Sequence, residues 1–290
     1  MINMKKYAGG KTPYELFSEA VGRKDKKSAD TIELNARKHK VEIAYRYYER
    51  AMDNQKLNIL NPSNVLSEIK QPLLGMYSSD CKLVKTFRDW YFQNNPQTYY
   101  DVCPYCTINS ANTTEHILPK EVYPEYAVNV FNLIPACSQC NSFKGDEIFD
   151  QNGEVFTINF YTDTLPDIRY LFARITQIIG GVQFKYFLNN RNGVDANLYA
   201  LIERHFDHYH LLDRYYAKAV QELPSIVNYF KSEELTCEAD YDKAASNLIR
   251  KTDEDSKVYG KNHWKIVMYY DAATSPVFKS YIMSQLNLIP

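Results

Sequence analysis

Residues 103–146 read CPYCTINSANTTEHILPKEVYPEYAVNVFNLIPACSQCNSFKGD. This stretch holds four of the six cysteines of the chain as two Cys-x-x-Cys pairs, and one histidine, His116, lies between the pairs. Each pair can form a tight turn that presents two thiolates to one ion, and four such sulfurs satisfy tetrahedral zinc. The sequence therefore predicts a structural Zn²⁺ site whose ligands are Cys103, Cys106, Cys137 and Cys140.

Other uses of these cysteines fit less well. A redox dithiol needs one pair only, and two disulfides are uncommon in the reducing interior of a cell. Residues 1–17 lack the apolar stretch of a secretory signal, and no later run approaches the roughly 18 apolar residues of a membrane span. We therefore expect a cytoplasmic protein that does not act on or in a membrane.

The charge of the chain is close to balanced, with a formal net charge of −1. The whole molecule therefore does not attract polyanions, and any basic surface must be local. Residues 1–60 carry 13 Lys and Arg against 8 Asp and Glu. This excess suits either a nucleic-acid contact or an ordinary solvated helix face.

The pattern of apolar residues divides the chain into three parts. Residues 1–98 form an N-terminal helical region, because apolar positions recur at three- and four-residue spacing from about residue 13. Residues 99–150 form the zinc module. Residues 151–290 begin with short strands, among them residues 153–161 and a hairpin through Gly180-Gly181, and continue as helices. The histidines of HFDHYH, residues 205–210, are a candidate metal site, but aromatic residues lie between them and no cysteine is near, which favours packing or exposure to solvent.

Chemistry-bearing residues follow one another in a fixed order between and after the cysteine pairs. TEHILPK occupies residues 114–120, FNLIPACSQCN occupies residues 131–141, and Lys144 follows. In these residues the chain resembles the HNH family of endonucleases, the zinc-bearing branch of the ββα-metal nucleases. The resemblance implies a central ββα-metal, treble-clef-like module. Together with the pattern of apolar residues, it predicts an α+β, mostly α protein in which helical regions flank this module and a short β-hairpin follows it.

The resemblance also implies the role of each residue. His116 matches the general base that activates water, and Asn132 matches the residue that orients this histidine. Glu115 and Asn141 match the ligands of a catalytic Mg²⁺ or Mn²⁺, an ion that prefers hard oxygen donors. Neighbouring strand residues point to opposite faces, so Glu115 and His116 should sit at a turn or bulge. A helix should begin at Asn141.

The implied activity is metal-dependent hydrolysis of phosphodiester bonds in DNA, with RNA left open as a substrate. Lys120 and Lys144 are candidates to hold flanking phosphates. The acid is Glu115 where many members have Asp, and the loop before Asn132 departs from the common pattern. The C-terminal helices resemble those of HNH proteins in bacterial defence systems such as Septu, which suggests antiviral defence or restriction and a partner ATPase.

A second interpretation is a zinc-ribbon adaptor that binds nucleic acid or protein without cutting. The order of residues favours the enzyme. A pure binding ribbon needs neither the acid–histidine pair nor asparagine at both later positions, and it usually carries more Lys and Arg.

Overall fold

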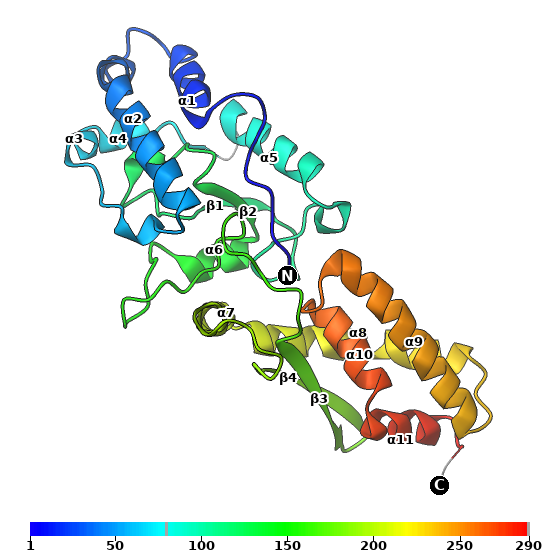
Figure 1. Cartoon of the computed structure of the whole chain (residues 1–290). Coiled ribbons are helices and arrows are strands. Elements are labelled where there is room, and N and C mark those ends of the chain that lie inside the picture. Colours follow the sequence, from blue (N-terminus) through cyan, green and yellow to red (C-terminus); the bar gives the residue numbers. More distant parts are fainter. Residues whose placement is uncertain (79–80, 289–290) are drawn as a thin grey trace. The chain divides into compact units, whose positions relative to one another are not determined.

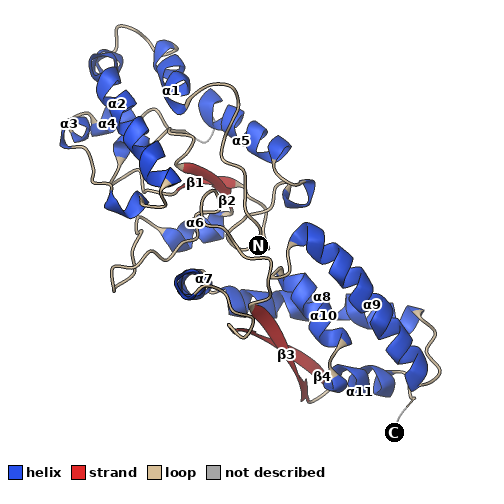
Figure 2. Ribbon diagram, in the orientation of Figure 1, coloured by secondary structure: helices blue, strands red, loops and turns tan. Residues whose placement is uncertain are grey.

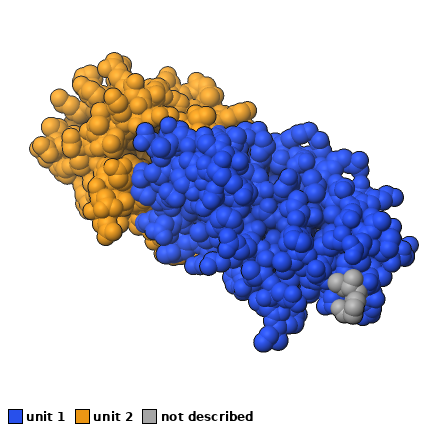
Figure 3. Space-filling model, turned by 60° about the horizontal axis from the view of Figure 1, so that its bottom comes forward, with its two compact units in different colours: residues 1–2, 165–290 blue, residues 3–164 orange. Residues whose placement is uncertain are grey.

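The computed structural model describes residues 1–78 and 81–288. The chain forms two compact units, residues 3–164 and residues 165–290 with residues 1–2, which are coloured separately in Figure 3. Each unit is described by itself. The domain boundaries expected from the sequence, between residues 98 and 99 and between residues 150 and 151, stay a prediction. Figure 2 shows that helices dominate and that the strands form small antiparallel pairs, as the sequence predicted.

The first unit begins with helices whose starts are encoded by capping residues. Thr12 accepts a hydrogen bond from the backbone of Glu15, whose side chain bonds back to Thr12, and Ser28 and Ser63 cap the helices that follow them. The helical segments of this region are α1 (Pro13–Gly22), α2 (Ala29–Asp53), η1 (Leu57–Ile59), α3 (Asn64–Ser67), α4 (Lys70–Leu74), α5 (Lys82–Asn94) and η2 (Gln97–Tyr99).

Residues 103–144 then fold as two strands and a helix. Strand β1 (Thr113–His116) pairs antiparallel with β2 (Leu133–Ala136), and α6 (Ser138–Lys144) follows β2 directly. The three elements lie together in Figure 1. The helix begins at Ser138, before Asn141, because Cys137 caps it by accepting the amide of Cys140. The expected ββα arrangement is confirmed.

Aromatic side chains of α2 connect the N-terminal helices to the ββα module. Tyr48 is fully buried, and its ring lies 4.8 Å from that of Tyr126, which belongs to the short helix η3 (Pro124–Tyr126). The hydroxyl of Tyr48 donates to the side-chain oxygen of Asn132, 3.1 Å away. The loop between β1 and β2 is therefore fastened to α2 by a tyrosine that lies 84 residues before Asn132 in the sequence.

The strand expected at residues 153–161 is wrong. Phe156, Ile158 and Phe160 are buried in alternation, which is the pattern that suggested a strand, but no ladder forms along this segment. One isolated bridge joins Val155 to Phe149, and the backbone oxygen of Phe160 accepts from the amide of Met4. The segment is therefore an irregular, buried stretch, because alternating burial specifies a strand only when a neighbour is present to pair with it.

The second unit contains the predicted hairpin and a set of helices. Strands β3 (Leu171–Ile178) and β4 (Gly181–Leu188) pair antiparallel through a turn in which Gly180 has φ of 80°, a conformation that glycine adopts without strain. The helices are α7 (Ala196–His208), α8 (Leu211–Ser232), α9 (Glu238–Tyr259), α10 (Trp264–Ala273) and α11 (Pro276–Gln285).

Two sets of polar contacts join the start of the hairpin to α10 and to the connection that precedes α10. The side-chain oxygen of Asn262 accepts the amides of Tyr170 and Leu171, and Asp271 binds the guanidinium of Arg169 with both carboxylate oxygens. His205 is fully buried with its ring 4.7 Å from that of Tyr209, in agreement with a packing role. Across the described residues, no helix has the length and apolar character that crossing a bilayer requires.

Candidate active site

The four predicted zinc ligands converge inside the first unit. Their Sγ atoms all lie within 4.8 Å of one another, and all four side chains are buried. The sulfurs of Cys106 and Cys137 are 3.9 Å apart, close to the separation of about 3.8 Å that tetrahedral zinc with bonds of about 2.3 Å requires. The amide of Cys140 also points to the sulfur of Cys137 at 3.4 Å, a contact that favours a thiolate. The donor set therefore fits a Zn²⁺ ion.

A polar cavity of about 240 Å³ opens beside the module that carries these four cysteines. The residues that line it include two from the end of β1, one from the following loop, one from α6, one just beyond α6, and one from the N-terminal helical region. The ones with chemical function are Glu115, His116, Lys120, Asn141, Asp146 and Tyr77. The general base and both metal ligands expected from the sequence thus share one cavity.

Glu115 and His116 reach this cavity from a regular strand. The β1–β2 register continues without interruption through Glu115 opposite Ile134 and His116 opposite Leu133, so the expected bulge is absent. Strand β1 ends at His116, and both side chains line the cavity at that end. Glu115 and His116 can therefore serve one site because they lie at the end of β1, and no bulge is needed.

A backbone carbonyl fixes the tautomer of His116. Nε2 of the ring lies 2.8 Å from the oxygen of Ala127. A carbonyl oxygen only accepts hydrogen bonds, so Nε2 must carry the proton and Nδ1 keeps the lone pair. Burial lowers the pKa of His116 to about 4, and the charges of Lys120 and Lys144 act in the same direction. The ring is therefore neutral at pH 7, with Nδ1 able to accept a proton.

Asn132 holds the loop that supplies the Ala127 carbonyl. Its side chain is fully buried, accepts from the amide of Leu118 at 2.7 Å, and donates to the oxygens of Leu118 at 2.9 Å and Tyr126 at 3.2 Å. These bonds close the loop between β1 and β2. Within the described residues, the side-chain hydrogen bonds of Asn132 go to the loop and to Tyr48 and not to His116, so any orienting effect on the ring passes through the loop and Ala127.

Tyr77 is a cavity residue that the sequence did not reveal. Its ring meets that of His116 edge-on at 4.5 Å, and its hydroxyl donates to the backbone oxygen of Thr114 at 3.0 Å. Burial, assisted by the charge of Glu115, raises the pKa of Tyr77 to about 12. The residue therefore stays a neutral phenol that packs against the imidazole.

The two lysines proposed for phosphate contacts lie in different surroundings. Lys120 is partly exposed at the cavity, and its ammonium pairs with Glu121 at 2.9 Å. Lys144 is buried, and its Nζ lies 3.1 Å from Oε1 of Glu115. A phosphate outside the module can approach Lys120, whereas Lys144 faces the carboxylate inside. The position of Lys144 follows from α6, which turns this residue toward β1.

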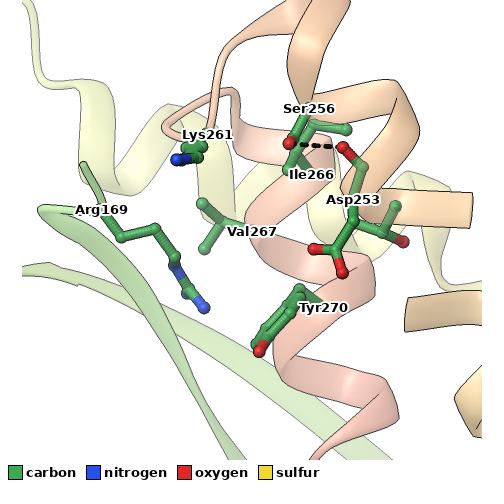
Figure 4. A pocket seen from close by; sticks show the side chains of 8 residues that line it. Arg169, Asp253, Ser256, Lys261, Ile266, Val267 and Tyr270 are labelled. Carbon is green, nitrogen blue, oxygen red and sulfur yellow. Dashed lines mark hydrogen bonds between the residues drawn. The ribbon is translucent and has the colours of Figure 1, made fainter. Parts of the chain in front are cut away.

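A second cavity, of about 160 Å³, lies in the other unit (Figure 4). The cations at this cavity already have acceptors. Arg169 is held by Asp271 at 2.7 and 2.8 Å, and Lys261 bonds to Asp167 at 2.9 and 3.1 Å. Most of the remaining lining is apolar or engaged in hydrogen bonds within the helices. These contacts stabilise the unit and do not assemble acid–base chemistry.

The fold and this site define a ββα module built around a cluster of four cysteines whose geometry fits zinc. Comparison with protein families agrees, because the family described as HNH endonuclease matches residues 103–147. The chain therefore carries an HNH endonuclease module.

Two curated proteins resemble parts of the chain. Protein ea31 of Escherichia phage lambda is 26% identical over 208 residues, which cover 64% of this chain and 69% of that protein. Septu protein PtuB of Bacillus thuringiensis is 55% identical over 31 residues, which cover 11% of this chain and 12% of that protein. No solved structure matches the chain significantly.

Proposed function

We propose that this protein is a metal-dependent endonuclease that hydrolyses phosphodiester bonds in DNA. The observation that carries the proposal is the single cavity lined by Glu115, His116 and Asn141. Hydrolysis of a phosphodiester needs a base for the attacking water and a cation for the charge that develops on the phosphate and the leaving oxygen. The three side chains supply the base and the ligands for such a cation.

His116 acts as the general base through Nδ1. Its hydrogen bond to Ala127 keeps Nε2 protonated, so the lone pair of Nδ1 is available to a water molecule in the cavity. A pKa near 4 makes the free ring a weak base. An anionic phosphate beside the ring favours the imidazolium form and raises this pKa, so basicity increases when substrate is bound.

Glu115 and Asn141 provide oxygen ligands of the kind that suit Mg²⁺ or Mn²⁺. When bound there, the divalent ion would stabilise negative charge on the phosphate and on the leaving 3′ oxygen. Asp146 lies at the same cavity, and its charge is close enough to raise the pKa of Glu115. The cavity thus offers a second carboxylate beside Glu115 to a bound cation. Lys120 is placed to contact a flanking phosphate.

We further infer a role in antiviral defence or restriction, with a partner ATPase. The similarity to Septu protein PtuB over 31 residues supports this context. Co-expression with any ATPase encoded beside this gene, followed by co-purification and phage challenge, tests it. A protein that cleaves DNA fully by itself and gives no protection in any combination contradicts the inference.

The activity is tested with supercoiled plasmid, linear DNA and RNA in Mg²⁺, Mn²⁺ or EDTA. We expect cleavage of DNA with a divalent ion and none in EDTA. His116→Ala should lower the rate by about 10²–10⁴-fold, the usual loss for a general base. His39→Ala is the matched control, because His39 is an exposed histidine of α2 in the same unit. DNA binding without cleavage under all conditions would favour the adaptor instead.

A further inference from the structure

The least expected group near the cavity is the ammonium of Lys144. Only 1% of its side chain is exposed, and only 7% of the side chain of its partner Glu115. Lys144 is the last residue of α6, four residues after the zinc ligand Cys140. Zinc bound by the four cysteines would therefore fix the backbone of α6, from which this lysine reaches β1.

The environment of this ammonium is poor for a buried charge. Taking an ammonium out of water costs several kcal/mol unless an opposite charge and further hydrogen bonds compensate. Nζ contacts Oε1 of Glu115 at 3.1 Å, but it makes no hydrogen bond of good geometry within the described part of the chain. An ammonium has three donors. Its neutralisation thus depends on one carboxylate, the same carboxylate that is the proposed metal ligand.

The buried carboxylate of Glu115 in turn has Lys144 as the cation that compensates its charge. Burial raises the pKa of Glu115, the contact with Lys144 opposes that shift, and Asp146 adds repulsion. In the absence of a divalent ion, Lys144 is the cation in direct contact with this buried carboxylate. A divalent ion that binds Glu115 meets a positive charge already in contact with the same group.

We propose that Lys144 is a resident counter-ion of Glu115 that competes with the catalytic divalent ion. It pairs with this buried carboxylate when no divalent ion is bound, and it lowers the affinity of the divalent ion for Glu115. This inference rests on the proposed function, because it takes Glu115 as a metal ligand. It also assigns Lys144 a role different from contact with substrate phosphate.

Mn²⁺ binding to the zinc-loaded protein without nucleic acid tests the proposal, with free Mn²⁺ measured by electron paramagnetic resonance. Lys144→Met should bind Mn²⁺ about 10-fold more tightly or better, since a like charge in contact with the ligand is removed. Lys144→Arg keeps the charge and should bind as the wild type does. Wild-type or weaker affinity in Lys144→Met, with full zinc content, overturns the proposal.

A second set of measurements separates this proposal from the assignment of Glu115. Glu115→Gln should lose most Mn²⁺ affinity, and an unchanged affinity in this variant would contradict the proposed function itself. If Glu115→Gln loses binding while Lys144→Met gains none, only the counter-ion proposal fails.

Stability provides an independent readout. Lys144→Met leaves a buried carboxylate without its partner, so thermal stability should fall without Mn²⁺ and recover as Mn²⁺ is added. The double variant Glu115→Gln/Lys144→Met has neither charge and should be more stable than Lys144→Met alone. If Lys144→Met does not fold, Lys144→Gln replaces it, because the neutral amide can still bond to Glu115. Equal stabilisation of wild type and variant by Mn²⁺ overturns the proposal.

Discussion

Replacement of Asn132 by alanine should cause an unusually large loss of stability for an uncharged side chain. The amide accepts from Leu118 and Tyr48 and donates to the carbonyls of Leu118 and Tyr126, at distances between 2.7 and 3.2 Å. A buried hydrogen bond contributes about 1 kcal/mol net, so loss of these four bonds should lower the free energy of unfolding by about 4 kcal/mol. The loop that carries Ala127 should then no longer fix His116.

Asn129 provides a matched control for this experiment. It is the same residue type, lies in the same loop, and is also fully buried. Within the described residues its side chain accepts one hydrogen bond, from the amide of Phe131 at 3.1 Å, and its Nδ2 has no partner. Asn129→Ala should therefore cost about 1 kcal/mol.

Urea unfolding, followed by fluorescence and extrapolated to water, measures both free energies. Cleavage assays without urea, at a temperature where both variants are folded, measure the effect on the site. Asn132→Ala should be several kcal/mol less stable than Asn129→Ala and should lose activity even when folded. Equal, small losses in the two variants would refute the argument that Asn132 closes the loop.

Three other substitutions probe separate parts of the molecule. Cys137→Ser should lose zinc and melt at a lower temperature, because the metal supplies much of the folding free energy of a small module; full zinc content with unchanged melting contradicts this. Tyr77→Ala should lower kcat by up to about 10-fold through loss of the ring contact with His116, whereas Tyr77→Phe should stay near wild type; equal rates in both variants remove the positioning role. Partial burial lowers the pKa of His263 to about 3. The unfolded chain therefore binds a proton at this histidine at a higher pH than the folded chain does, and stability falls as pH drops below ~6.5. His263→Gln should flatten that acid limb in melting curves, and an unchanged slope counts against it.

The sequence was sufficient for features that depend on local spacing. Each Cys-x-x-Cys pair presents two thiolates through its own tight turn, and the four cysteines lie together as the zinc prediction required. The order of Glu115, His116 and Asn141 relative to those pairs predicted that they would share a site, and they line one cavity. Gly180 likewise specifies a turn through its own backbone freedom.

Features that depend on packing between distant segments could not be predicted in this way. Tyr77 reaches the site from a helical region whose apolar pattern looks the same whether or not it touches a histidine. Lysine is a residue type that usually lies on the surface, and Lys144 is buried only because α6 packs against β1. Apolar and polar residues alternate in residues 153–161 as they do in a strand, but the segment's own sequence does not indicate that a pairing neighbour is missing.

The most direct test of the central claim is anomalous diffraction from crystals soaked in Mn²⁺. We expect a zinc peak at the four cysteine sulfurs and a separate manganese peak in the cavity, at about 2.0–2.4 Å from oxygens of Glu115 and Asn141. A manganese peak elsewhere, with Glu115 and Asn141 free of metal in crystals of active protein, would contradict the account.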